Sequence, residues 1–498
     1  MKKNAIYIML GMLFLMVSCT KNSLNIIEYP VKSDPTIAFK IVFTVGSAHD
    51  PEGKEGLAYL TARMLTDGST QKLTYSEILD QLYPMAASYS SQVDKEVTTI
   101  SGRVHSDNVD KYIELLTDAI ISPAFDETDF NRIKNETISY LESTLRYSSD
   151  EELGKAALYS FIFKNTPYAH PVQGYVSSLK SITLKDIQNF YQQHYNQSNL
   201  IVGIGGGYTQ STLSDLSDRL RQFPVGTATA VPQVSPEPID GLHVLIVEKP
   251  NAQSTAISFG HPLELLRGNP DWYALDVARS WLGEHRNSSS HLYQVIREAR
   301  GLNYGDYAYI EHFPRGGYRQ FPPTNIVRHA QIFEIWIRPV PNYARHFALR
   351  AAMAELNKLI SEGLSKDEFE LTKQFLSNYI LNYAPTTSMK LGYRIDDYLY
   401  GIKGHHLDLY KTHLNKMNIE ETNSAIKRYL NDKHMKIVFV TSDAKQLAQD
   451  LVSNTPSPIQ YKEPKPKSVM DEDKLFSTYR LNISPDNIQI VPVDKIFE

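Results

Sequence analysis

Two kinds of hydrophobic pattern alternate along the chain. Short apolar runs with the length of a strand include residues 37–43 and 332–337. Longer stretches with apolar residues three and four positions apart, such as 108–121 and 345–360, indicate amphipathic helices. Strands and helices interleave in both halves of the chain. The pattern therefore predicts two α+β domains, each with a sheet covered by helices on one side.

A segment of the first half recurs in the second half. Residues 121–130, followed by Lys134, resemble residues 360–369, followed by Lys373, and the offset from Ser122 to Ser361 is 239 residues. A common offset across several apolar positions indicates an internal duplication. Two proline-rich stretches, 224–240 and 455–467, are typical of linkers. We therefore predict a first domain at 19–223, a linker at 224–240, a homologous second domain at 241–454, and a proline-rich linker and tail at 455–498.

The N-terminus carries the features of an export signal. Lys2 and Lys3 precede the apolar run 5–17, which is too short to remain as a membrane-spanning helix. The run ends at Ser18-Cys19 and resembles a bacterial lipobox, in which the cysteine receives lipid and becomes the mature N-terminus. Cys19 is the only cysteine, so no internal disulfide can form. We predict a signal peptide at 1–18 and an exported lipoprotein, anchored through Cys19 in the bacterial cell envelope and facing the periplasm.

Composition narrows the class of protein. With 498 residues, 42% of them hydrophobic and 21% charged, the chain is globular and long enough for two domains. These values exclude general disorder and a multi-spanning membrane protein. The net charge of −5 lacks the basic excess that nucleic-acid binding requires, so nucleic acid is not an expected partner.

The segment 46–69 carries the most specific pattern. Its Gly56-Leu57-Ala58 and the residues that follow resemble the strand, loop and helix that open a domain of the insulinase/pitrilysin-type zinc metallopeptidases. In that family an inverted zinc motif, His-x-x-Glu-His, holds the metal and the general base. The resemblance implies that four positions have lost these roles: Tyr59 and Arg63 for the histidines, Ala62 for the glutamate, and Tyr140 for the third ligand. We therefore expect no zinc in this chain.

The second half keeps another family feature. Residues 292–304 contain Arg297-Glu298 and Gly301-Leu302-Asn303-Tyr304, which resemble the family segment Arg-Glu-x-x-Gly-Leu-x-Tyr. The resemblance implies that Arg297 binds substrate carbonyls and Tyr304 stabilises the oxyanion, in trans on a zinc-bearing domain. The alternative is structural: Arg297 makes a salt bridge with Glu298 or a neighbour, and Tyr304 packs in a strand. The resemblance extends from about residue 37 to about residue 450 and implies two tandem domains of mostly antiparallel sheet covered by helices, the insulinase-like fold.

Two further patterns contain residue types that occur in phosphate-binding or metal-binding sites. The glycine run 203–207 lacks the lysine and the serine or threonine of a phosphate-binding loop. A second group, Glu284, His285, His291 and Glu298, contains metal-ligating residue types. His285 and His291 are six residues apart and cannot share one face of a helix, and 287–290 is typical of a helix start that would interrupt the row. A zinc site there is disfavoured.

Three functions remain open. In the first, the chain is the non-catalytic partner of a zinc-bearing homologue and supplies Arg297 and Tyr304 for the degradation or processing of peptides or proteins in the envelope. In the second, it is a stand-alone lipoprotein that binds extended peptide or unfolded protein, with the segment 87–93 as an edge strand for the peptide. In the third, it is a metalloendopeptidase with an atypical zinc site, for which the sequence offers no convincing residues.

Overall fold

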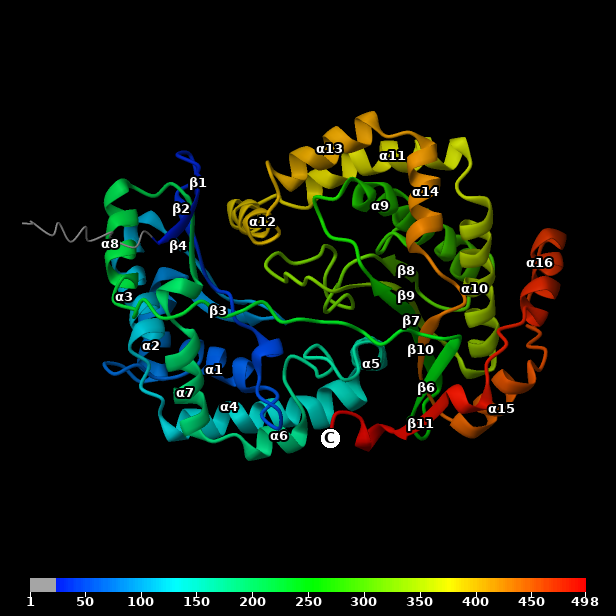
Figure 1. Cartoon of the computed structure of the whole chain (residues 1–498), viewed down its shortest axis with the longest axis horizontal. Helices are drawn as coiled ribbons and strands as arrows, with labels where there is room; N and C mark the ends of the chain where they lie inside the picture. The colour runs from blue at the N-terminus through cyan, green and yellow to red at the C-terminus, as the bar shows by residue number, and fades with distance from the viewer. Residues whose placement is uncertain (1–23) are drawn as a thin grey trace, which may run out of the picture.

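The computed structural model describes residues 24–498, so the expected signal peptide and Cys19 lie outside the described residues. In this described part no helix has the length and apolar character needed to cross a bilayer. Two sheets, one in each half of the chain, form the frame of the molecule, and helices cover them (Figure 1).

The sheet of the first half has the strand order β1-β5-β2-β4-β3 among the described residues. Only the β1–β5 pair is parallel, and β3 lies at one edge of the sheet. The elements of this half are β1 (Asn25–Pro30), β2 (Thr36–Phe43), α1 (Leu57–Thr66), α2 (Tyr75–Leu82), β3 (Ser88–Val93), β4 (Thr98–His105), α3 (Val109–Ile121), α4 (Glu127–Ser139), a π-helix η4 (Tyr140–Ser148), α5 (Asp150–Ile162), α6 (Val176–Ser181), α7 (Leu184–His194), β5 (Leu200–Gly206) and α8 (Gln210–Leu220).

The sheet of the second half has the order β11-β6-β10-β7-β9-β8 in the described chain. Its β7, β9 and β8 are antiparallel neighbours, whereas β6 is parallel to both β10 and β11. The elements are β6 (Leu242–Glu248), β7 (Ser254–Leu263), α9 (Pro270–Gly283), a π-helix η6 (Tyr293–Glu298), β8 (Asp306–Tyr309), β9 (Gln331–Pro341), α10 (Arg345–Glu362), α11 (Lys366–Tyr379), α12 (Thr387–Leu399), α13 (His406–Lys416), α14 (Ile419–Tyr429), β10 (Met435–Thr441), α15 (Ala444–Ser453), α16 (Lys467–Thr478) and β11 (Ile488–Pro492).

The two tandem α+β domains predicted from the sequence are confirmed, and the duplicated elements keep their offset. Helix α4 begins at Glu127 and α11 at Lys366, the same 239-residue separation seen in the sequence. The sheets differ from the expectation in one respect. Each has a helix from the opposite half on its second face: α12 packs on β5, β1 and β2, and α5 packs on β7 and β10 (Figure 1).

Strand β2 shows why both faces of the first sheet are covered. Its Phe39 and Ile41 point into the main core of the first half, whereas Ala38 and Val42 pack against Leu391 and other residues of α12. Because successive side chains of a strand face opposite ways, a run that is apolar at every position requires cover on both sides. The continuous apolar run at 37–43 is therefore accounted for by the helix that crosses from the other half.

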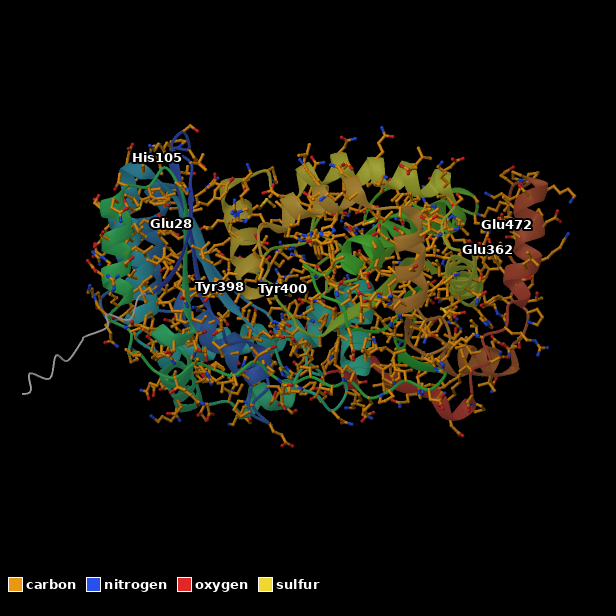
Figure 2. All side chains as sticks on the ribbon, turned by 45° about the horizontal axis from the view of Figure 1, so that its top comes forward. Glu28, His105, Glu362, Tyr398, Tyr400 and Glu472 are labelled. Atoms are coloured by element: carbon orange, nitrogen blue, oxygen red, sulfur yellow. The ribbon has the colours of Figure 1, made fainter. Side chains whose placement is uncertain are left out.

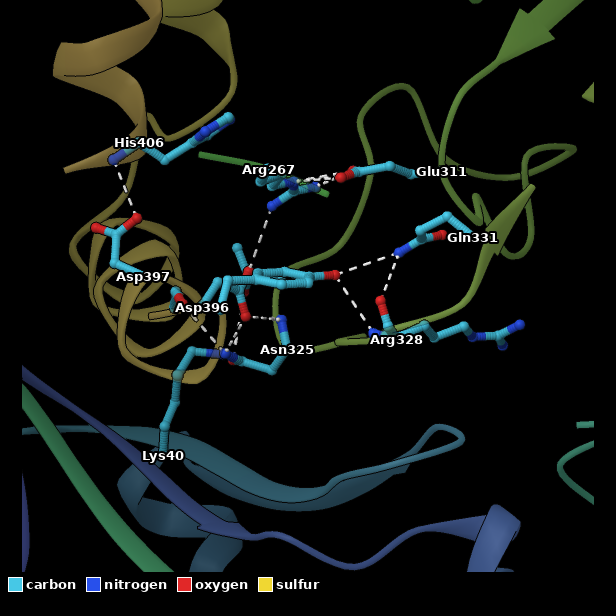
Figure 3. A network of polar contacts seen from close by, with 12 residues as sticks. Lys40, Arg267, Glu311, Asn325, Arg328, Gln331, Asp396, Asp397 and His406 are labelled. Atoms are coloured by element: carbon cyan, nitrogen blue, oxygen red, sulfur yellow. Dashed lines mark hydrogen bonds and ion pairs between the residues drawn. The ribbon is translucent and has the colours of Figure 1, made fainter. Parts of the chain in front are cut away.

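One polar network lies within this crossing contact (Figure 3). The Lys40 ammonium on β2 donates to Asn325 Oδ1 at 2.8 Å, and the Asn325 backbone N–H donates to Asp396 Oδ1 on α12 at 2.9 Å. Burial lowers the pKa of Lys40 to about 8 and raises the pKa of Asp396 to about 7. The network joins β2, α12 and the segment between β8 and β9, so it fixes the two halves relative to each other.

The segment 455–498, expected as a linker and tail, contains α16 and the edge strand β11. Helix α16 packs on α10 (Figure 2, where Glu472 and Glu362 mark the two helices). The chain end then returns to the first half, where Arg146 Nε donates to the Ile496 carbonyl and Arg146 Nη2 to Glu498 Oε2, both at 2.9 Å.

Candidate functional site

The helix that carries the altered zinc motif, α1, has a tightly defined start. Gly56 precedes it with φ of 101°, and a Cβ atom there would lie 2.4 Å from the Gln173 carbonyl oxygen, so only glycine fits. The Asp50 carboxylate accepts hydrogen bonds from the Gly56 and Ala58 amides at 2.7 Å each. Burial raises the pKa of Asp50 to about 8, against the opposing effect of these two donors. The cap fixes the direction in which residues 59–63 face.

The four altered zinc-site positions have separate surroundings. Tyr59 and Tyr140 line one cavity, whereas Ala62 is fully buried. Arg63 instead bonds to carboxylates, to Asp67 through Nε and to Glu136 Oε2 through Nη2 at 3.0 Å. The positive charge of Arg63 is therefore neutralised within the first half.

A zinc ion does not fit these residues. Structural and catalytic zinc sites use histidine, cysteine and carboxylate ligands, and a catalytic site needs three of them. Here the positions hold two phenols, a methyl group and an ion-paired guanidinium. Within residues 24–498 no three side chains of histidine, cysteine, aspartate or glutamate gather in a way that could hold a metal.

The cavity that Tyr59 and Tyr140 line has a volume of about 440 Å³ and is called the chamber below. Residues 90–95, from the end of edge strand β3, form one wall. Side chains of α5 and residues 168–173 form others, and the segment 310–330 between β8 and β9, the β8–β9 loop, closes it. Gln92 Nε2 holds this loop to β3 by donating to the carbonyls of Thr324 and Asn325 at 2.9 and 3.1 Å.

Arg297 and Tyr304 lie together at a different cavity. The Arg297 Cζ atom is 5.9 Å from the centre of the Tyr304 ring, and the Tyr304 side chain is 77% exposed. Both line an open cleft of about 830 Å³, the pair cleft, together with Tyr147, Tyr318 and Arg338. In the described chain the Arg297 guanidinium has no ion pair or hydrogen bond, and its Nε atom is buried without a partner. The salt bridge of Arg297 with Glu298 or a neighbour, on which the structural alternative depended, is absent from residues 24–498.

Comparison with known proteins places these features in a family. One model, described as insulinase (peptidase family M16), matches residues 28–174, and another, described as peptidase M16 inactive domain, matches residues 181–376. The chain belongs to the insulinase family, peptidase family M16. The assignment of Tyr59, Ala62, Arg63 and Tyr140 to the zinc-ligand and general-base positions of this family stays a prediction from the sequence.

Individual M16 relatives agree with this assignment. The non-peptidase homolog YmxG of Helicobacter pylori is 25% identical over 460 residues, which cover 88% of this chain and 98% of that protein. An uncharacterized zinc protease of Rickettsia felis is 24% identical over 204 residues, which cover 41% of this chain and about half, 49%, of that protein. The crystal structure of a peptidase M16 inactive domain from Pseudomonas fluorescens matches with a TM-score of 0.73 and 20% identity, over 84% of this chain and 95% of that one.

The second group of metal-ligating residue types in this M16 chain is dispersed among other contacts. Glu284 pairs with Arg279 at 2.7 Å, His285 bonds to the Tyr309 hydroxyl at 2.8 Å, and His291 bonds to Glu355 at 2.6 Å. Glu298 is exposed. Glu284, His285 and His291 are thus each bonded to a residue outside this group.

Sequence reasoning missed the residues of the β8–β9 loop that reach the chamber. Arg315, Arg319 and Arg328 line it, and Arg328 forms two hydrogen bonds with Asp94 at the end of β3, at 2.9 and 2.5 Å. The run Pro314-Arg315-Gly316-Gly317-Tyr318-Arg319 is a detectable signal, because cationic and aromatic side chains flank two glycines in a long connection between strands. Its position beside β3 is a property of the fold and is absent from the local pattern.

Proposed function

We propose that this M16 homologue is the non-catalytic partner of a zinc-bearing homologue and supplies Arg297 and Tyr304 to the substrate bound there. The observation that carries the proposal is the contrast between two arginines, Arg63 and Arg297. At the altered zinc site Arg63 is committed to Asp67 and Glu136. At the pair cleft Arg297 and Tyr304 are adjacent, both line an open cleft, and in the described chain neither is engaged by a carboxylate.

The chemistry of the pair suits substrate binding and oxyanion stabilisation. A guanidinium donates hydrogen bonds in a fixed plane, so Arg297 is suited to hold peptide carbonyls of an extended peptide or unfolded protein. The Tyr304 hydroxyl is a single donor on a rigid ring, which suits it to the oxygen that becomes negative when a peptide bond is attacked. The metal, the water and the general base would belong to the partner subunit.

Pairing of subunits has precedent in this family. M16 proteins often act in pairs, such as the subunits of mitochondrial processing peptidase. In the present chain the pair cleft is open, which leaves Tyr304 accessible to a second protein. The proposal also includes the bacterial cell envelope as the location, with lipid on Cys19 as the anchor, on the strength of the lipobox-like segment ending at Cys19.

Stand-alone binding of an extended peptide is the second candidate. It is favoured by one observation: residues 90–94 of the edge strand and its end line the chamber. An edge strand presents unpaired backbone groups to which a peptide can add by hydrogen bonding. An M16 peptidase with an atypical zinc site has no supporting group of ligands among residues 24–498.

Reconstitution distinguishes the two candidates. The purified chain is mixed with a zinc-bearing M16 homologue from the same organism, and cleavage of an unfolded protein is measured with each chain alone and with both. We expect activity in the mixture above that of the zinc-bearing chain, and a loss of this gain with Arg297→Ala. Arg480→Ala, at an exposed arginine outside both cavities, is the matched control. An unchanged rate on mixing would refute the partnership and leave peptide binding as the better account.

A further inference from the structure

The chamber beside β3 contains more positive than negative charge. Two carboxylates line it, Asp94 and Glu152, together with the basic side chains Lys95, Lys155, Arg315, Arg319 and Arg328. His170 also lines it, but burial lowers the pKa of His170 to about 3, so its ring is neutral at physiological pH. The distribution of hydrogen bonds shows which of these charges are balanced.

Both carboxylates are already engaged by the β8–β9 loop. Asp94 takes two hydrogen bonds from Arg328. Glu152, at the start of α5, accepts the backbone amides of Arg315 and Gly317 at 3.2 Å each. The Asp94 charge is therefore balanced by Arg328, whereas Glu152 is held by backbone amides.

The two lysines are also accounted for within the protein. Lys155 donates to the Phe313 carbonyl at 2.7 Å and lies over the rings of Tyr309 and Trp336, at 4.8 and 4.6 Å from their centres. Lys95 donates to the His170 carbonyl, and burial lowers the pKa of Lys95 to about 7. Both lysine side chains are therefore already hydrogen-bonded within the protein.

Arg315 and Arg319 remain. In the described chain their guanidinium groups have no hydrogen bond and no carboxylate within ion-pair distance, yet both line the chamber. Partial burial and the neighbouring Arg315 lower the pKa of Arg319, although an arginine stays protonated at physiological pH. Like charges held close together are unfavourable, and a bound anion would relieve this repulsion.

The backbone that carries the two arginines is held firmly. Arg319 N donates to the Arg315 carbonyl at 3.1 Å and closes a turn. His285 Nε2 bonds to the Arg319 carbonyl at 2.8 Å, and Arg286 Nη2 donates to the Gly317 carbonyl at 2.5 Å. Fixed backbone with free side-chain donors is the arrangement of a preorganised binding site.

We propose that the chamber binds a carboxylate carried by an extended peptide, with Arg315 and Arg319 as the groups that receive it. A guanidinium matches the two oxygens of a carboxylate with parallel hydrogen bonds. The β3 edge offers backbone partners for the peptide, and the volume of about 440 Å³ lies within the range of about 300–1,000 Å³ usual for small-ligand sites. His312 also lines the chamber and leaves Nδ1 without a partner in the described chain, as an additional polar contact.

The inference deepens the peptide-binding candidate and is independent of catalysis in trans, because it concerns the chamber and not the pair cleft. A carboxylate has two sources in a peptide, an acidic side chain and the C-terminus. Three fluorescent hexapeptides separate them: one with an internal glutamate and an amidated end, one with glutamine in its place and an amidated end, and the glutamine peptide with a free C-terminal carboxylate. Binding to the purified chain is measured by fluorescence anisotropy.

We expect at least one carboxylate-bearing peptide to bind about tenfold or more tightly than the glutamine amide, with a preference that weakens as salt is added. Arg319→Gln and Arg315→Gln should each abolish the preference, and Arg480→Gln should retain it. Arg315 is exposed, so its replacement leaves the core intact. Equal affinity for all three peptides, binding of none, or a preference that survives both substitutions would overturn the inference. Such a result would say nothing about peptidase activity in the reconstituted pair, so the two proposals can be tested separately.

Discussion

The buried ion pair between Asp94 and Arg328 joins the first half to the β8–β9 loop, and Asp94→Asn should destabilise the chain. Arg328 Nε donates to Asp94 Oδ2 at 2.9 Å and Nη2 to Oδ1 at 2.5 Å, and the side chains are 2% and 4% exposed. The substitution preserves shape and one acceptor oxygen. It leaves the Arg328 charge uncompensated, close enough to Lys95 to lower the pKa of that lysine further.

The magnitude follows from the surroundings of Arg328. Removing one partner of a buried pair costs about 3–5 kcal/mol in the free energy of unfolding. The Tyr159 and Tyr168 rings, 4.9 and 5.9 Å from the Arg328 Cζ atom, still face the cation, so we expect about 3 kcal/mol. Unfolding entropy of about 2.1 cal/mol/K per residue over 498 residues is about 1 kcal/mol/K, which places the fall in Tm near 3 °C if the chain unfolds in one transition.

Calorimetry and urea unfolding measure both quantities. Arg428→Ala is the matched control. Its ion pair with Asp271 has a similar length, 2.6 Å, but the Arg428 side chain is 63% exposed, so the expected loss is much smaller. Replacing the buried pair together, Asp94→Leu with Arg328→Met, should recover much of the loss. A loss for Asp94→Asn no larger than that of the control would refute the reasoning.

Three further results are expected. Glu334 is fully buried, and neither of its carboxylate oxygens has a partner in the described chain. Burial raises the pKa of Glu334 to about 7. The folded state therefore retains a proton that the unfolded state loses above about pH 4.5. The free energy of unfolding should therefore fall by up to about 3 kcal/mol as pH rises from about 4.5 through 7. Urea unfolding of Glu334→Gln should not show this fall, and a pH dependence identical to that of the wild type would exclude a role for Glu334. Elemental analysis should find no stoichiometric zinc in the wild-type chain and restored binding when four residues are changed together, namely Tyr59→His, Ala62→Glu, Arg63→His and Tyr140→Glu; one tightly held zinc in the wild type would contradict the account. Cys19→Ser should abolish lipid modification and leave the protein unprocessed or released from membranes. A variant that both fractionates and migrates like the wild type would disprove the lipobox interpretation.

The elements and their duplication were predictable because their signals are local. The periodic stretches 108–121 and 345–360 correspond to α3 and α10, and the apolar runs 37–43 and 332–337 lie within β2 and β9. In each case one face, or both faces, of the element is buried, and that burial imposes the spacing of apolar residues. The resemblance to the M16 family then predicted that these elements form two tandem domains.

The contacts between the halves were not predictable in the same way. An apolar face on α5 or α12 shows that the helix packs against something, but it does not say that the sheet of the other half is its partner. The proline-rich appearance of 455–467 likewise gave no sign that β11 would return to pair with β6. Arg315 and Arg319 gain their meaning only because the β8–β9 loop docks on β3, far away in sequence.

Turnover by the assembled pair of chains, with Tyr304→Phe in this subunit, tests the central claim most directly. The substitution removes one exposed hydroxyl, so assembly with the zinc-bearing homologue, measured by the Kd of the complex, should be unchanged. An oxyanion donor contributes on the order of 3 kcal/mol in the transition state, so kcat should fall by roughly a hundredfold. Tyr343→Phe, at a 68% exposed tyrosine outside the pair cleft, should leave both quantities unchanged. An active mixed complex whose kcat is the same with Tyr304 and with phenylalanine at that position would contradict the account.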